Sequence, residues 1–222
     1  MPADRPEDPE RCAQVVLLVG PSGCGKTYLA HSLDLPVLAL DNFYRGADDP
    51  AIPRNAEDRP DWEHPGSWNA EAAVAALDRL CCDDSVTVPD YSLSESRAVG
   101  TVELHREGSP VVIAEGIFAG ELIEPLRQEG LLADALLVTQ NRWVTFARRL
   151  VRDLREGRKE ASYLVRQGWA KLRAEPAIVA RQKAQGARPV SKAQARARIL
   201  ALAAPDHQIV GRVGIEPTTQ GL

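Results

Sequence analysis

Four short, nearly continuous apolar runs give the strongest structural signal in the sequence. They cover residues 15–19, 36–40, 111–114 and 133–138, and a glycine or a polar residue follows each of them. Strands that are buried on both faces of a parallel sheet have this pattern, whereas half-exposed strands alternate. A helical stretch at 26–33 separates the first two runs, so we expect the chain to open with a βαβ unit of an α/β fold.

The remaining segments predict helices and one small hairpin. Asn69 is suited to cap a helix that runs to about Leu80, and residues 119–128 also predict a helix. Residues 86–88 and 99–104 are strand-like and short, which indicates a β-hairpin lying off the main sheet.

Two long segments have a distinct character. Residues 42–68 show no period and contain four prolines and four aromatic residues, and a segment of this length is usually functional or disordered. Beyond Arg142 the pattern is mostly helical and strongly basic.

The composition fits one domain with two unstructured ends. Hydrophobic residues make up 44% of the 222 residues and charged residues 26%, which allows a single sizeable core. Residues 1–12 are rich in proline and charge and predict a disordered leader, while 205–222 lack a period and predict an unstructured tail. We therefore assign residues 13–204 to the folded domain.

Charge and hydropathy exclude several classes of protein. The chain has 27 Lys and Arg against 31 Asp and Glu, a net charge of -4, which argues against a general nucleic-acid binder. It has no apolar run long enough to cross a membrane and no signal-peptide pattern at its start, so we expect a cytoplasmic protein without a membrane partner. The four cysteines lack C-x-x-C spacing and are expected to be reduced thiols.

The turn after the first apolar run has the pattern G-x-x-x-x-G-K-[ST] of a phosphate-binding loop. Its glycines let successive backbone N–H groups face an anion, and the following helix adds the positive end of its dipole. The lysine is expected to reach the β- and γ-phosphates of ATP, and the threonine hydroxyl to ligate Mg²⁺. The ATP-binding residues predicted here are Gly20, Pro21, Ser22, Gly23, Cys24, Gly25, Lys26 and Thr27.

Two carboxylates follow apolar runs at the sheet edge where the phosphate loop is expected. Glu115 is placed to reach Mg²⁺ beside Thr27. Asp41 is placed to accept a proton from an attacking hydroxyl, to contact the metal, or to do both. A simple role in capping the turn is an equal alternative for Asp41.

Several separated segments together resemble the uridine kinase family, within the wider group that includes phosphoribulokinase and pantothenate kinase. The resemblance implies a three-layer P-loop NTPase fold, with a parallel sheet flanked by helices, a helical lid and a small β-hairpin insertion. It also implies that Asp41 is the catalytic base. The segments are 20–27, Leu40-Asp-Asn-Phe-Tyr-Arg45, Asp61-Trp-Glu-His-Pro65, 88–97, Val111-Val-Ile-Ala-Glu-Gly-Ile117 and Arg148-Arg-Leu-Val-Arg-Asp153.

The resemblance also implies an acceptor pocket. Tyr44 is expected to line it, Glu63 stands where the family has an aspartate that contacts ribose hydroxyls, and Tyr91 is expected to pack near the base. Arg97 lies in the same matched segment and is a further candidate. The sequence departs from the family here, because Ser92 replaces an aspartate and no histidine lies around Glu95 to read a pyrimidine.

A lid over the phosphates is the last implied feature, at about residues 142–175. Arg148 and Arg152 are one helical turn apart and share a face, so we expect them to act on the transferring phosphoryl group. Arg149 points elsewhere on a helix and is assigned to the substrate. A solvated basic helix face is the alternative for each arginine.

These observations together predict an ATP-dependent and Mg²⁺-dependent transfer of phosphate to the 5'-hydroxyl of a pyrimidine nucleoside. One alternative is a related kinase of another small hydroxyl metabolite, such as a phosphorylated sugar or pantothenate. Another is a nucleotide-dependent regulatory ATPase. The expected partner is a nucleoside-like small molecule, and a homo-oligomer is left open.

Overall fold

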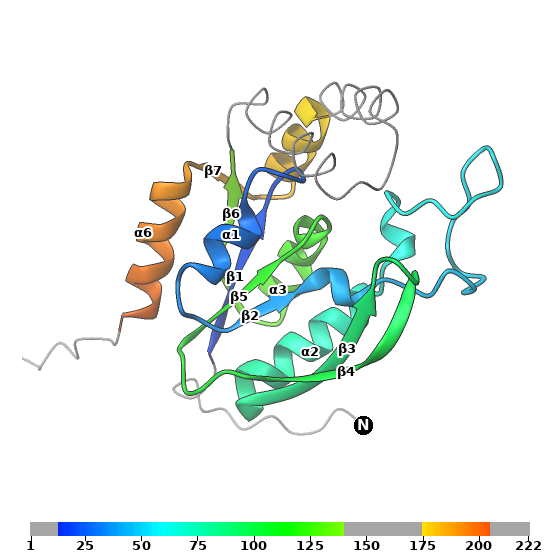
Figure 1. The fold of residues 1–222 in the computed structure, drawn as a ribbon. Helices are drawn as coiled ribbons and strands as arrows, with labels where there is room; N and C mark the ends of the chain where they lie inside the picture. Colours follow the sequence, from blue (N-terminus) through cyan, green and yellow to red (C-terminus); the bar gives the residue numbers. More distant parts are fainter. Residues whose placement is uncertain (1–12, 140–174, 205–222) are drawn as a thin grey trace, which may run out of the picture.

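A parallel sheet forms the centre of the molecule (Figure 1). The structure, a computed structural model, describes residues 13–139 and 175–204. Five strands lie in the order β2-β5-β1-β6-β7, and every neighbouring pair is parallel. Their bounds are β1 Gln14–Val19, β2 Val37–Ala39, β5 Val111–Glu115, β6 Leu132–Val138 and β7 Arg188–Val190.

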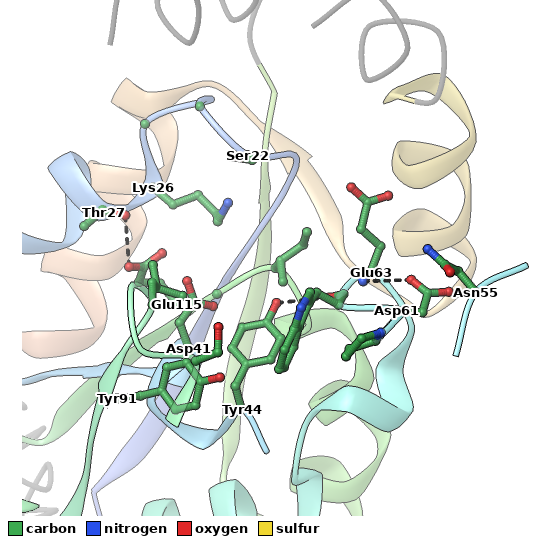
Figure 2. Close-up of a pocket in the computed structure, with 18 residues that line it drawn as sticks. Ser22, Lys26, Thr27, Asp41, Tyr44, Asn55, Asp61, Glu63, Tyr91 and Glu115 are labelled. Atoms are coloured by element: carbon green, nitrogen blue, oxygen red, sulfur yellow. Dashed lines mark hydrogen bonds between the residues drawn. The ribbon is translucent and has the colours of Figure 1, made fainter. Parts of the chain in front are cut away.

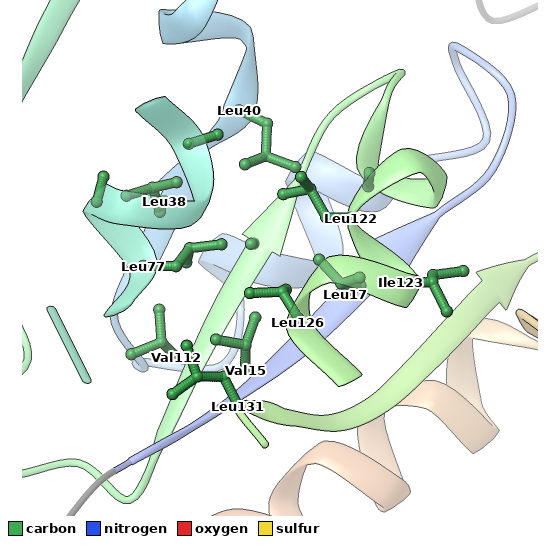
Figure 3. Close-up of a cluster of buried hydrophobic side chains, with 14 of the residues drawn as sticks. Val15, Leu17, Leu38, Leu40, Leu77, Val112, Leu122, Ile123, Leu126 and Leu131 are labelled. Carbon is green, nitrogen blue, oxygen red and sulfur yellow. The ribbon is translucent and has the colours of Figure 1, made fainter. Parts of the chain in front are cut away.

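Helices cover both faces of the sheet and make three layers. On one face, Val15 and Leu17 of β1 pack in a cluster with Leu77 and Leu126 (Figure 3), which belong to α2 (Ala70–Asp83) and α3 (Ile123–Gln128). On the other face, Val16 and Leu18 pack toward α1 (Lys26–His31) and α6 (Lys192–Ala203). The continuous apolar runs are therefore explained by strands that are covered on both sides.

A two-stranded hairpin lies apart from the main sheet. Its strands are β3 (Ser85–Ser92) and β4 (Arg97–His105), longer than the sequence pattern indicated. Val86 and Val88 are buried because β3 packs against α2, whereas almost all of β4 is exposed. The sequence pattern predicted this hairpin. It lies beside the long loop 44–68, and both segments contribute residues to the candidate site.

Three short 3-10 helices lie within the part of the chain that the structure describes. One of them, η1 (Leu40–Phe43), follows β2 directly and contains Asp41, so this residue lies on a turn after the strand. The others are η2 (Pro65–Ser67) and η3 (Ala119–Leu122), and η3 forms the first part of the helix expected at 119–128.

The sequence pattern was wrong at one point and is untested at others. Residues 188–190 were grouped with helical chain but form strand β7, which pairs on one side only among the described residues, and such an edge position tolerates Pro189. The lid arginines, the leader and the tail lie outside the described residues and stay predictions. Within the described part of the chain, no helix is long and apolar enough to cross a membrane.

Candidate active site

The phosphate loop connects β1 to α1 and carries a buried lysine. Gly25 precedes the first residue of α1 in the left-handed conformation, with φ 90° and ψ 32°, which glycine adopts without strain. The ammonium of Lys26 donates hydrogen bonds to the carbonyls of Gly20 at 2.8 Å and Pro21 at 3.2 Å. Only 7% of the lysine is exposed, so its charge is held close to the loop backbone.

Thr27 and Glu115 meet across the carboxyl edge of the sheet. Strands β1 and β5 are parallel neighbours with Leu18 opposite Glu115, so the segments that follow the two strands begin at the same edge of the sheet. The Thr27 hydroxyl donates to the Glu115 carboxylate, Oγ1 to Oε1, at 3.0 Å. The two residues are distant in sequence, and the parallel register brings them together.

Asp41 lies beside this pair. Ala39 of β2 is opposite Glu115, which places the next turn of chain at the same edge. Gly116 makes the approach possible, because a Cβ on it would lie 2.8 Å from the Cβ of Leu40 and 3.1 Å from Oδ1 of Asp41. The absence of a side chain at residue 116 therefore leaves room for the Asp41 carboxylate.

The surroundings of Asp41 disfavour its charge. Burial raises the pKa of the carboxyl and the nearby charge of Glu115 raises it further, while Lys26 and the backbone N–H of Ile117 act in the opposite direction. By surface area the residue is exposed, because its side chain opens into a cavity, yet protein surrounds it closely. Exposure of the side chain to solvent therefore limits the size of the pKa shift, and its direction stays upward.

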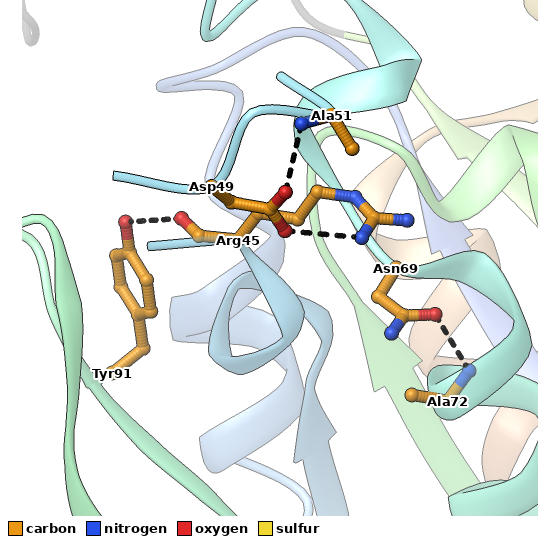
Figure 4. Close-up of polar contacts among 6 residues, drawn as sticks. All are labelled: Arg45, Asp49, Ala51, Asn69, Ala72 and Tyr91. Atoms are coloured by element: carbon orange, nitrogen blue, oxygen red, sulfur yellow. Dashed lines mark hydrogen bonds and ion pairs between the residues drawn. The ribbon is translucent and has the colours of Figure 1, made fainter. Parts of the chain in front are cut away.

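Aromatic side chains stand next to Asp41. The ring of Tyr44 lies 5.9 Å from Trp62 and 5.8 Å from Tyr91, measured between centroids. Burial raises the pKa of the Tyr44 hydroxyl, and the charge of Asp41 adds to this, so the hydroxyl stays protonated and able to donate. The Tyr91 hydroxyl donates to the backbone carbonyl of Arg45 at 3.1 Å and ties the hairpin to the loop (Figure 4).

The loop that carries Tyr44 and Trp62 is tied at its base. The buried indole of Trp68 donates to the carbonyl of Leu40 at 2.7 Å, directly before Asp41. The backbone N–H of Arg45 donates to Ser67 at 2.9 Å. At the same junction Asn69 caps α2, and its side chain accepts from the N–H of Ala72 (Figure 4). The turn that contains Asp41 and the loop 44–68 are therefore one connected unit.

One cavity of about 960 Å³, large for a ligand pocket, is lined by Lys26, Thr27, Asp41, Glu115 and the aromatic residues Tyr44, Trp62 and Tyr91 (Figure 2). Thr27 and Glu115 lie together at the end with Lys26, and Tyr44 and Tyr91 lie on the opposite side of Asp41. The cavity is lined by Ser22, Gly23, Gly25, Lys26, Thr27, Asp41, Tyr44, Asn55, Pro60, Asp61, Trp62, Glu63, Tyr91, Leu93, Ser96, Glu115, Gly116 and Ile117.

Comparison with known proteins gives a consistent result. No protein-family profile matches the chain. It is 27% identical over 166 residues to a uridine kinase of Chloroflexus aurantiacus, covering 72% of this chain and 77% of that protein. It is 24% identical over 160 residues to a uridine kinase of Aeromonas hydrophila, covering 67% and 72%.

Solved structures agree at the level of the fold. A candidate fructose transport system kinase from Silicibacter sp. TM1040 matches with a TM-score of 0.56 and 19% identity, covering 85% of this chain and 91% of that one. The YGR205w protein matches with a TM-score of 0.50 and 14% identity, covering 83% and 88%. The chain has the P-loop kinase fold. The resemblance to uridine kinases, first seen in separated motifs, is confirmed as a similarity over most of the chain.

The P-loop kinase fold brings together most of the residues that the sequence singled out. Among the predicted ATP-binding residues, Gly20, Pro21 and Cys24 form the loop without lining the cavity, and Cys24 is fully buried. Arg97 does not line the cavity either and pairs with Glu95 on the exposed hairpin. Arg148, Arg149 and Arg152 lie outside the described residues.

Sequence reasoning missed several residues of the cavity wall. Asn55 and Asp61 line the cavity, as do Leu93 and Ser96 from the turn of the hairpin. Asp61, Leu93 and Ser96 had a signal, since they belong to the matched segments 61–65 and 88–97, whereas Asn55 had none. Trp62, in the same matched segment as Asp61, also lies in the cavity wall.

Three oxygen-bearing side chains near the phosphate loop suit a magnesium ion. Thr27, Glu115 and Asp41 offer only oxygen atoms, which Mg²⁺ prefers. The charge of Glu115 raises the pKa of Asp41, so a cation here would relieve the repulsion between two carboxylates. In the described ranges no three His, Cys, Asp or Glu residues gather as a metal cluster. A magnesium ion would therefore complete its shell with phosphate oxygens and water.

Proposed function

We propose that the protein is an ATP-dependent kinase that phosphorylates the 5'-hydroxyl of a pyrimidine nucleoside. The observation that carries the proposal is the position of Asp41, which faces one cavity between the phosphate loop and the aromatic pair Tyr44 and Tyr91. The similarity to uridine kinases and the P-loop kinase fold support an ATP-dependent kinase.

The donor end of the cavity is suited to hold the polyphosphate of ATP. The loop amides and the first turn of α1 offer donors to phosphate oxygens, and the Lys26 ammonium can exchange its carbonyl partners for them. Thr27 and Glu115 are the residues that would hold Mg²⁺, with Asp41 close enough to contribute. The metal would neutralise charge on the β- and γ-phosphates.

Asp41 is assigned the transfer of the acceptor proton. As the hydroxyl oxygen bonds to the terminal phosphorus, the bond from that phosphorus to the β,γ-bridging oxygen breaks and ADP leaves. The hydroxyl proton passes to the Asp41 carboxylate and from there to solvent. A carboxylate with a raised pKa is better suited to this task than an ordinary one, because its affinity for the proton is higher.

The acceptor end favours an uncharged, planar molecule. Tyr44, Trp62 and Tyr91 offer faces and edges on which a base can stack. Asp61 and Glu63 add acceptors for sugar hydroxyls, and Lys26 is the one cationic side chain among the described residues that line the cavity. A phosphorylated sugar or the carboxylate of pantothenate would meet repulsion there, which favours a nucleoside among the alternatives.

Turnover assays with a panel of acceptors test the proposal. The full chain is incubated with Mg-ATP and uridine, cytidine, fructose, pantothenate or ribulose 5-phosphate, and ADP release is followed while mass spectrometry identifies the product. We expect turnover with uridine or cytidine and the formation of a 5'-monophosphate. Turnover with only another compound would overturn the choice of nucleoside.

An Asp41→Asn variant separates a kinase from a regulatory ATPase. Loss of a general base is expected to lower kcat by about 10²- to 10⁴-fold. Asp83→Asn, an exposed position at the end of α2, is the matched control and should keep full activity. A slow ATP hydrolysis that no acceptor stimulates and that Asp41→Asn leaves unchanged would favour the regulatory ATPase.

A further inference from the structure

The edge strand β7 directs the chain back to the phosphate loop. Val190 lies opposite Val138 at the end of β6, and the N–H of Thr139 donates to the Val190 carbonyl at 3.1 Å. Because β7 is parallel to β6 and β1, it ends at the same edge of the sheet as the phosphate loop. The next helix, α6, therefore begins at that edge (Figure 1).

The start of α6 is held rigidly. A capping box closes it, with the Ser191 hydroxyl accepting from the N–H of Gln194 and the Gln194 side chain accepting from the N–H of Ser191. Ile199 is fully buried in the cluster that includes Leu29 of α1. Further along, Arg196 donates to the carbonyl of Ser32 at 3.2 Å. The first residue of α6 is thus positioned by well-packed elements.

That first residue is Lys192, and the end of its side chain lies on the phosphate loop. A Cβ added to Gly25 would be 2.3 Å from Nζ and 2.9 Å from Cε of Lys192. Gly25 belongs to the phosphate loop and immediately precedes Lys26, the first residue of α1. Burial raises the pKa of the Cys24 thiol in the same loop, and the charges of Lys26 and Lys192 both act against this rise, so both ammonium groups lie near the thiol.

We propose that Lys192 is a second cation of the donor site and binds the polyphosphate of the nucleotide. The inference rests on the nucleotide site of the proposed function. It adds to that site a residue that is distant from the phosphate loop in sequence. Lys26 reaches the loop from α1 and Lys192 reaches it from α6, so the phosphates would be held between two separate helices. Charge-assisted contacts of this kind are among the stronger hydrogen bonds in proteins.

A structural role for Lys192 is the competing explanation. The buried carboxylate of Glu175 also acts on the Cys24 thiol, so it lies in the same neighbourhood. A lysine that only balanced this buried charge would matter for folding and not for the ligand. The two roles differ in what the loss of the lysine changes.

Calorimetric titration of the full chain with Mg-ATP and with magnesium tripolyphosphate tests the proposal. Lys192→Gln is expected to raise the Kd of both ligands about tenfold, the loss of one charge-assisted contact. Lys192→Arg should restore most of the affinity. Lys183→Gln, an exposed lysine on the helix at 175–184, is the matched control and should change neither Kd by more than about twofold.

The double variant Lys192→Gln with Glu175→Gln decides between the two roles. The proposal expects ATP binding to stay weak in this protein even where its melting temperature returns to that of the wild type. The proposal would be overturned if the double variant regained both affinity and stability. It would also be overturned if Lys192→Gln weakened the binding of Mg-ATP but not that of magnesium tripolyphosphate. Wild-type ATP binding without turnover of any acceptor would contradict the proposed function alone, whereas no wild-type binding would overturn both.

Discussion

The two ends of the cavity are built by different means. At the donor end, the phosphate loop joins β1, whose residues 15–19 are fully buried, to a helix, and main-chain geometry sets the positions of its groups. At the acceptor end, the wall consists of side chains from the loop 44–68 and the hairpin, and much of it is exposed. The comparison suggests that the donor end determines the reaction and the acceptor end determines the substrate.

The strongest test of this division removes the charge at the donor end. Lys26→Ala should lower kcat/KM by about 10³-fold with every acceptor, because the ammonium would stabilise the transferring phosphoryl group directly. Steady-state ADP release measures the effect, and Lys183→Ala serves as the control. An acceptor whose turnover survived this change would contradict the idea of one common donor site.

The next test acts on the boundary between the two ends. In Gly116→Ala, the new Cβ would lie within 3.1 Å of Oδ1 of Asp41 and closer still to Leu40, so the carboxylate must move. We expect kcat to fall by about 10- to 100-fold while the Kd of Mg-ATP stays the same. Gly100→Ala on β4, where nothing lies within 4 Å of the new atom, should behave as wild type. Equal losses in both variants would argue against displacement of Asp41.

A smaller effect is expected from the aromatic wall. Trp62→Leu should raise the KM of the nucleoside about tenfold and leave the Kd of Mg-ATP unchanged, because the lost stacking surface contacts only the acceptor. Initial rates at varied nucleoside concentration measure it. A matching change in ATP affinity would show that the two ends are not independent.

The smallest predicted effect concerns pH. Burial and Glu115 raise the pKa of Asp41, so kcat/KM should fall on the acid side at a pH above the usual range of an aspartate. Between the unfolded and folded pKa values the folded state binds more protons, and stability therefore decreases as pH rises through the folded pKa. Asp41→Asn should melt slightly higher than wild type at neutral pH, a difference that disappears in acid. The Asp41 side chain is open to solvent, so this difference in melting temperature is small. Thermal unfolding of both proteins at several pH values measures it.

The donor end could be read from the sequence because its signals are local. The phosphate loop is one uninterrupted motif, and continuous apolar runs such as 111–114 identify strands covered on both faces. Glu115 and Asp41 were predictable for the same reason, since each follows such a run. The edge strand β7 was missed because three residues with a central proline carry no periodic signal.

The acceptor end could be predicted only through the family resemblance. Tyr44, Trp62 and Tyr91 come from two separate segments, and their proximity depends on contacts such as the one between Trp68 and Leu40. Propensity and periodicity do not encode such contacts. Lys192 was missed for a similar reason, because its approach to Gly25 follows from the packing of α6 and not from any motif.

The paired ends of the long loop have a consequence for how specificity could change. The N–H of Arg45 bonds to Ser67 and that of Asn69 to Phe43, so the intervening chain departs from the body of the molecule and returns at one point. Such an excursion can be exchanged or lengthened at little entropic cost. Replacing the loop between these paired ends would change which acceptor binds and leave the phosphate-binding end unaltered. Relatives of this chain could diversify by that route.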